Sequence, residues 1–264
     1  MKNILVPIGT SKNVSKHLQY AIDFAESFGA KLFVIQVYNV YTRAGTMIKV
    51  DKIIERESLK NLKRLVARVD TKGVEINIKV LKGDLIDTIE LACKAADIDL
   101  MLVEPRTTSV KDEVFLGKTS GKIIKQTQIP ALIVPENTVF KPLTNILFGV
   151  KSAILRKPEA LNPLKEIKSK FQAKVNLLLV KTTFYKPSDF NLSEEMKALV
   201  DSVKKTENPT TYHGVLQHQE SINPDLLCVV RRKRGFFTKH WEKNVILKKE
   251  FSSKIPVLVL SGLK

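Results

Sequence analysis

Residues 97–135, DIDLMLVEPRTTSVKDEVFLGKTSGKIIKQTQIPALIVP, decide the fold of this chain. They predict a buried strand at 100–103, a polar loop, an amphipathic helix at 117–126 and a second buried strand at 131–134. Both apolar runs are short and flanked by turn or charged residues, which is typical of strands covered on both faces in a parallel sheet. Two parallel strands need a crossover connection, and the helix supplies it.

The same unit appears again at residues 225–260, DLLCVVRRKRGFFTKHWEKNVILKKEFSSKIPVLVL. Asp99 aligns with Asp225 and Pro130 aligns with Pro256, and each pair is 126 positions apart. Such self-similarity is the signature of a repeat, so the chain is predicted to be an internal duplication.

With 264 residues, the duplicated chain is predicted to form two domains, at 1–140 and 141–264. In the first domain the apolar patterns predict strands at 3–8, 31–38, 74–81, 100–103 and 131–134, and helices at 14–28, 51–69, 84–96 and 117–126. Strict alternation in the third strand indicates an edge strand. The second domain restarts with a strand at 145–150 and places its third strand near 210–212. Too little chain then remains before Asp225 for a crossover helix, so we expect that helix to be lost or shortened.

The composition is that of an ordinary globular protein, with 44% hydrophobic and 27% charged residues. No apolar run approaches the length of a membrane span and the first residues are too short for a signal peptide, so a cytoplasmic protein without a membrane partner is expected. Cys93 and Cys228 lie in apolar patterns and are interpreted as inert core residues. No spacing indicates a metal site, and no nucleophile or carboxylate pair indicates an enzyme.

Six segments together resemble the universal stress protein family, here as a tandem pair: ILVPIGTS, AKLFVIQV, KGD, DLMLV, LGKTSGKII and IPALIVP. The resemblance implies an α/β fold of two Rossmann-like (adenine nucleotide α-hydrolase-like) domains. Each would hold a mainly parallel five-stranded sheet of order 3-2-1-4-5, with helices on both faces. It also implies that the domains pair through their last strands, 131–134 and 257–260. Further association of the pair through the same kind of surface, into a homodimer, is left open.

One branch of this family binds adenine nucleotides through a glycine pattern, G-x2-G-x9-G followed by Ser or Thr. Placed on this sequence, its positions fall on Glu104, Thr107, Gly117 and Lys118. Two of the three glycines are missing, and a carboxylate stands where a triphosphate would pass. The family's acidic residue after the first strand falls on Gly9. In the second domain the pattern falls on Val230, Lys233, Lys243 and Asn244.

These departures favour a non-catalytic stress-response or regulatory protein that needs no cofactor and does not bind ATP in the usual way. The alternative is an ATP, ADP or AMP switch, or a slow ATPase, that uses the first domain. The residues that would line a nucleotide or anion site there are Pro7, Gly9, Val37, Arg106, Thr107, Gly117, Lys118, Thr119 and Ser120.

A net charge of +17 and the run RRKRGFFTKHWEKN at 231–244 leave a third interpretation open. Cations in this run would contact phosphates and its aromatic rings would stack on bases, giving an anion-binding or nucleic-acid-binding module. The residues concerned are Arg231, Arg232, Arg234, Phe236, Phe237 and Trp241. We favour packing against the other half or against a protein partner, so nucleic acid is the less favoured of the two.

Overall fold

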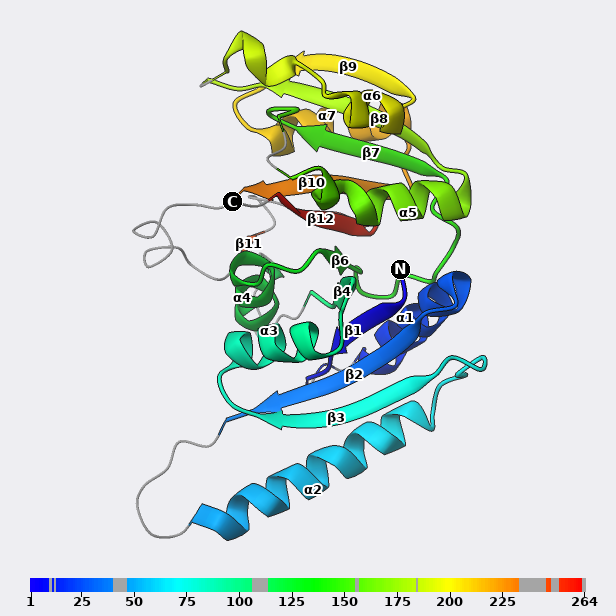
Figure 1. Cartoon of the computed structure of the whole chain (residues 1–264), viewed down its shortest axis with the longest axis vertical. Helices are drawn as coiled ribbons and strands as arrows, with labels where there is room; N and C mark the ends of the chain where they lie inside the picture. Colours follow the sequence, from blue (N-terminus) through cyan, green and yellow to red (C-terminus); the bar gives the residue numbers. More distant parts are fainter. Residues whose placement is uncertain are drawn as a thin grey trace.

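The computed structural model describes residues 1–9, 11, 13–39, 47–105, 114–154, 157–183, 185–232, 246–247 and 252–262. Within them the main feature is a ten-stranded sheet that runs the length of the molecule (Figure 1). Its strand order is β3-β2-β1-β4-β6-β12-β10-β7-β8-β9. Each half therefore contributes five neighbouring strands.

Apart from β5, the first half follows the elements that its patterns predict. Its strands are β1 (Asn3–Pro7), β2 (Lys31–Tyr38), β3 (Ile76–Lys82), β4 (Leu100–Val103), β5 (Val114–Leu116) and β6 (Ala131–Ile133). Its helices are α1 (Val14–Phe28), α2 (Met47–Val66), α3 (Leu85–Ala95) and α4 (Lys118–Gln126). Gly29 ends α1 with φ of 62°, and the side chain of Asp84 caps α3 by accepting from the Ile86 N–H at 2.9 Å. The order β3-β2-β1-β4-β6 is the predicted 3-2-1-4-5 arrangement, with β3 at the edge as expected.

The second half repeats this order in reverse across the sheet. Its strands are β7 (Asn145–Val150), β8 (Lys174–Lys181), β9 (Ser202–Glu207), β10 (Leu226–Arg232), β11 (Ile246–Leu247) and β12 (Val257–Gly262). Its helices are α5 (Asn162–Phe171), α6 (Glu194–Leu199) and α7 (Thr211–Ile222), with short 3-10 turns η1 (Pro158–Leu161) and η2 (Pro187–Phe190).

Two predictions for the second half were wrong. The third strand is β9, not residues 210–212, and the crossover helix before Asp225 is present as α7. The side chain of Thr210 caps α7 by accepting from the His213 N–H at 3.2 Å, so this threonine begins a helix. The shortened element is α6, whose six residues stand where the first half has the 20 residues of α2.

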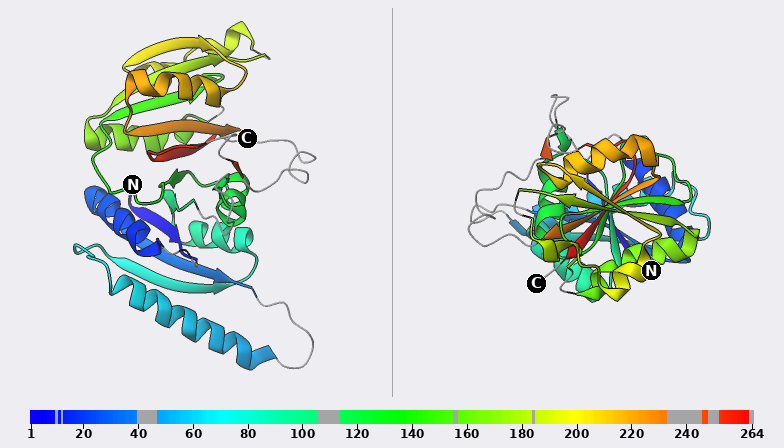
Figure 2. Two further views of the ribbon diagram at one scale, coloured as in Figure 1. Left: turned by 180° about the vertical axis from the view of Figure 1, so that it is seen from behind. Right: turned by 90° about the horizontal axis from the view of Figure 1, so that it is seen from above.

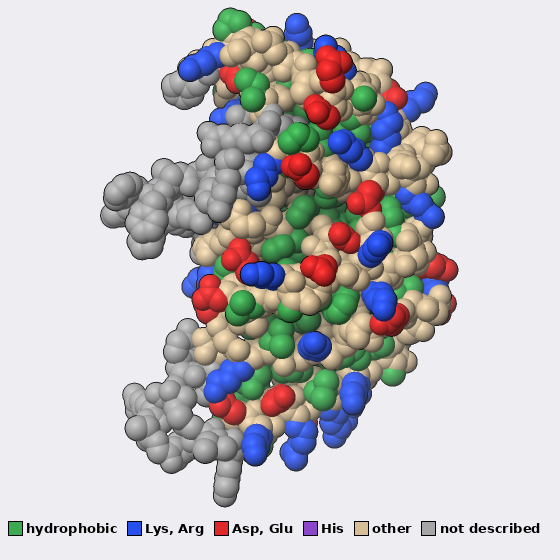
Figure 3. Space-filling model, viewed as in Figure 1, with side chains coloured by type: hydrophobic (Ala, Val, Ile, Leu, Met, Phe, Trp, Pro, Cys, Tyr) green, Lys and Arg blue, Asp and Glu red, His purple; other side chains and the backbone are tan. Residues whose placement is uncertain are grey.

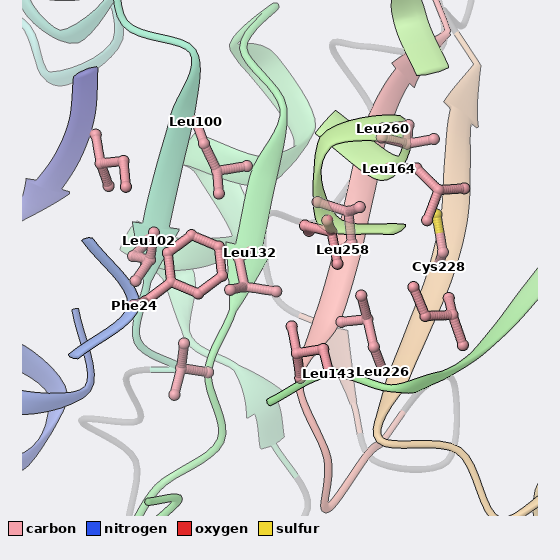
Figure 4. Packing of buried hydrophobic residues seen from close by; sticks show 14 of the residues in the cluster. Phe24, Leu100, Leu102, Leu132, Leu143, Leu164, Leu226, Cys228, Leu258 and Leu260 are labelled. Atoms are coloured by element: carbon pink, nitrogen blue, oxygen red, sulfur yellow. The ribbon is translucent and has the colours of Figure 1, made fainter. Parts of the chain in front are cut away.

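The two halves join through their last sheet strands, as predicted. β6 and β12 pair antiparallel, with Leu132 opposite Leu258 (Figure 4). All the other neighbours in this sheet are parallel. A second, two-stranded antiparallel sheet of β5 and β11 also connects the halves, and neither of these strands was predicted from the sequence.

Helices cover both faces of the sheet (Figure 2). One core cluster lies against α1, α2, α5 and α6, and the other lies against α3, α4 and α7. The first cluster extends across the junction between the halves. There the ring of Phe140, which lies between β6 and β7, meets the rings of Tyr20 and Phe171 at centroid distances of 5.5 and 6.1 Å. The amino terminus of Met1 forms an ion pair with Glu166 on α5.

One hydrogen-bonded clamp occurs in both halves and supports the duplication. Asp99 accepts from the Asn3 N–H at 3.0 Å, and Asp225 accepts from the Asn145 N–H at 3.1 Å. Each carboxylate ties the start of the fourth main strand of its half to the start of the first. The clamp therefore fixes the amino-terminal edge of both half-sheets.

Candidate functional site

The candidate site lies at the carboxyl end of β1 and β4, which are neighbours in the sheet. Ligands of doubly wound sheets bind at this edge, where the strand order reverses. Pro7 ends β1 and is buried, Gly9 follows it and is half-buried, and Val37 near the end of β2 is half-buried. All three belong to the edge predicted for a ligand.

Helix α4 begins near the same edge. Gly117 stands at its N-cap with φ of −67° and ψ of 170°, and no side chain caps the helix there. Lys118 and Thr119 are exposed, whereas Ser120 is only 2% exposed. Helix amino termini attract anions through their N–H groups and dipole. Arg106 and Thr107, the other two predicted site residues, lie outside the described residues.

Glu104, directly after β4, is the centre of a hydrogen-bonded cluster at this edge. Its side chain is buried, at 2% exposure, and Oε1 accepts from the Ser11 hydroxyl at 2.7 Å. Ser11 in turn accepts from the Asn13 N–H at 3.1 Å. The Ser120 hydroxyl donates to the Glu104 carbonyl at 2.6 Å. This arrangement, the Ser11–Glu104–Ser120 clasp, connects the loop after β1, the end of β4 and the first turn of α4.

The sequence placed Glu104 and Ser120 correctly at this edge but missed Ser11. The available signal was its position in the loop after β1, because the carboxyl ends of the neighbouring strands β1 and β4 lie at the same edge of the sheet. A glycine at position 104 would have no side chain at this edge, whereas the glutamate adds a side chain with a negative charge. The glutamate thus places a buried carboxylate, hydrogen-bonded by the Ser11 hydroxyl, at this edge.

The second half has a different edge. Val230 lies 126 positions after Glu104 and takes its place, so an apolar side chain replaces the carboxylate. Lys233, Lys243 and Asn244 lie outside the described residues. A hollow of about 610 Å³ in this half is lined by Asn145 and Lys174, the first residues of β7 and β8, and thus lies at the opposite edge of the sheet.

Arg231, predicted to contact a partner or nucleic acid, joins the two halves in the structure. From β10 its Nη1 donates to the Ile124 carbonyl at 2.7 Å, and its Nη2 donates to the Thr127 carbonyl. Nη2 also lies 3.4 Å from the Ser261 hydroxyl. Burial lowers the pKa of the guanidinium, although the negative charge of Glu90 opposes this shift. The guanidinium thus lies at the carboxyl end of α4, where the helix dipole favours a cation.

The remaining candidate residues of the run 231–244 have side chains that the structure does not describe. The backbone of Arg232 ends β10, but its side chain is not described, and neither are Arg234, Phe236, Phe237 and Trp241. Packing or nucleic-acid binding by these residues stays a prediction.

The fold and this edge define a class of protein: a tandem α/β protein whose Rossmann-like halves share one sheet. Residues 1–135 match the model of the universal stress protein family, and because the match covers half of the chain, the chain belongs to that family. No helix among the described residues has the length and apolar character required to cross a membrane.

Several known proteins are similar to this chain in sequence or in fold. A universal stress protein of Methanocaldococcus jannaschii is 22% identical over 138 residues, which are 50% of this chain and 81% of the relative. The crystal structure of a universal stress protein from Archaeoglobus fulgidus has a TM-score of 0.73 at 19% identity, covering 98% of this chain and 96% of that one. A functionally unknown protein from Pseudomonas aeruginosa has a TM-score of 0.61 at 14% identity, covering 98% and 92%. These two structures share the fold over both halves.

Proposed function

We propose that this chain is a non-catalytic stress-response protein whose first-half ligand edge is closed to ATP. One observation carries the proposal: the buried carboxylate of Glu104, held by Ser11 at the place where the nucleotide-binding branch has a glycine. Family membership supports the stress-response role. A cytoplasmic location stays a prediction.

Charge repulsion is the physical reason that Glu104 would oppose the binding of a nucleotide. A phosphate oxygen about 4 Å from a carboxylate is repelled by about 4 kcal/mol per pair of unit charges when the effective dielectric constant is near 20. A typical small-ligand affinity in the micromolar range corresponds to about 8 kcal/mol, so one such contact removes a large share of it. Protonating Glu104 would relieve the repulsion but would give up the charge that strengthens its hydrogen bond with Ser11.

The test is denaturing extraction and mass spectrometry of freshly purified protein, followed by calorimetric titration with ATP, ADP and AMP. We expect no co-purified nucleotide and no binding heat at millimolar ligand. A nucleotide found at about one per chain would refute the proposal and establish the alternative, a nucleotide switch or slow ATPase.

A gain-of-function variant sharpens the test. Replacing Glu104 and Thr107 together by glycine restores the two missing glycines of the family pattern, and we expect measurable ATP binding. The matched control is Glu136→Gly, which removes an exposed carboxylate elsewhere and should bind no ATP. If the double variant folds, as judged by circular dichroism, and still binds no ATP, then Glu104 is not what closes the edge.

A second candidate function is binding of a small phosphate-type anion at the start of α4. It is favoured by the uncapped amino terminus at Gly117 and by the exposed side chains of Lys118 and Thr119. Titration with inorganic phosphate tests it: binding that is lost in Lys118→Gln would support the site, and absence of heat in the wild type would rule it out.

The homodimer stays a prediction. The pairing of β6 with β12 uses the last-strand edges of both halves inside one chain. Association of two chains would therefore need another surface. Sedimentation velocity tests the prediction, because a single monomer species would contradict it.

A further inference from the structure

The outer face of α2 carries an unusually regular row of cations. Lys52, Arg56, Lys60 and Arg64 follow one another at intervals of four residues, and Lys63 lies beside them. With 3.6 residues per turn, all five fall within an arc of about 120° and span about 18 Å along the helix. We call these five residues the α2 cation row; all are exposed to solvent.

The acidic residues of α2 lie largely off this row. Asp51 forms an ion pair with Lys82 on β3. Desolvation raises the pKa of Tyr38, and the negative charge of Glu55 raises it further. Glu57 lies beside the row and forms an ion pair with Arg56, with its Oε1 3.3 Å from Nε of Arg56. Within the part of the chain that the structure describes, Lys52, Lys60, Lys63 and Arg64 have no ion-pair partner.

The row flanks a shallow groove and lies at one end of the molecule. Figure 3 shows Lys and Arg side chains along the lower end, over α2. The groove has a volume of about 490 Å³ and is lined by Arg56, Leu59, Lys60, Lys63, Arg64 and Ala67. Like charges four residues apart destabilise a helix, so local helix stability does not explain the row.

From this geometry we propose that the α2 cation row binds the phosphate backbone of duplex nucleic acid. A basic stripe along one helix in a protein with a sequence pI near 9.7 is the electrostatic pattern of phosphate binding. The cations form a line, as phosphates do along one strand. An anionic membrane fits less well, because interfacial helices insert a continuous apolar face, and the outward apolar side chains Val50 and Ile53 occur only near the start of α2.

The experiment measures fluorescence anisotropy of a labelled 20-base-pair DNA duplex of mixed sequence as a function of salt. The full-length variant Lys60→Gln, Lys63→Gln, Arg64→Gln should bind at least about tenfold more weakly at 50 mM salt. The slope of log K against log salt should fall in magnitude by about 2.7, because each lost phosphate contact contributes about 0.9. The three residues are exposed, so thermal unfolding should change little.

Two control variants distinguish binding by the α2 cation row from an effect of net charge and from binding by the basic segment after β10. Lys151→Gln, Lys170→Gln, Lys204→Gln removes the same charge from exposed positions in the second half, and Arg232→Gln, Arg234→Gln changes the segment after β10. Both should keep the wild-type slope to within about one unit. Any of four results would overturn the proposal: no duplex binding by the wild type, an equal loss in the second-half variant, loss only in the Arg232 and Arg234 variant, or binding to vesicles of anionic lipid without binding to the duplex.

Discussion

Arg231 offers the sharpest test of how the two halves are held together. The change is Arg231→Gln, which removes the cation that bonds the carbonyls of Ile124 and Thr127. Hydrogen bonds from a charged donor contribute about 1.5–3 kcal/mol each, and part of this is offset by the cost of burying the guanidinium. We therefore expect the free energy of unfolding to fall by about 2–4 kcal/mol, measured by equilibrium urea unfolding followed by circular dichroism.

Two further variants make this measurement specific to Arg231. Lys254→Gln removes an exposed cation from the same half and should change the free energy of unfolding by less than about 0.5 kcal/mol. Arg231→Lys keeps the charge but lacks the planar fork that reaches two carbonyls, so it should lose an intermediate amount. If Arg231→Gln matched wild-type stability to within about 0.5 kcal/mol, the inference that Arg231 helps to hold the two halves together would be wrong.

Three other perturbations follow from single contacts. Gly149→Ala would place a methyl group against Cγ2 of Val215 on α7 and should cost about 1–3 kcal/mol of stability by urea unfolding, with Val215→Ala in the same chain recovering part of the loss. Tyr20→Phe should leave stability within about 1 kcal/mol of wild type or raise it, because the buried hydroxyl has no hydrogen-bond partner among the described residues; a larger loss would reveal a partner. Burial alone would raise the pKa of the Asp225 carboxyl. The hydrogen bond and charge of Lys141, with bonds from Thr144 and Asn145, outweigh this effect and lower the pKa. The stabilising contribution of this carboxyl should therefore be present above about pH 4 and lost as pH falls through the lowered pKa, and acid-unfolding profiles of Asp225→Asn should lack that loss.

Most strand positions in this sheet were predictable because those strands are short apolar runs. Strand β9 was not, because its sequence SVKKTE is polar and largely exposed. Helix α7 was not, because the residues at its start, Thr210 to Tyr212, have β-branched or aromatic side chains that favour strands. Its buried face is formed by Gly214, Val215 and His218, which is a weak apolar signal. Thr210 is also a good helix N-cap, and its side chain caps α7 in the structure. The prediction of a strand at these residues did not take this capping property into account.

The candidate site was predictable in position but not in detail. The strand order implied by the family resemblance brings Pro7, Glu104 and Ser120 to one edge, as observed. The bond from Ser11 to Glu104 depends on how the loop after β1 bends, and side-chain hydrogen bonds between segments 93 residues apart leave no periodic pattern in the sequence.

The two halves are alike at the amino-terminal edge of the sheet and differ near its carboxyl-terminal edge. Asp99 and Asp225 bond backbone N–H groups at the amino-terminal edge, and every fold of this topology needs those groups satisfied whatever it binds. Glu104 directly follows β4 at the carboxyl-terminal edge, whereas its counterpart Val230 lies within β10, near the carboxyl end of that strand. A duplicated chain can therefore keep its scaffold while its two ligand edges diverge, one toward a buried carboxylate and the other toward an apolar residue. It follows that neither half can serve as a model for ligand binding by the other, and substitutions at 104 and 230 should affect binding independently.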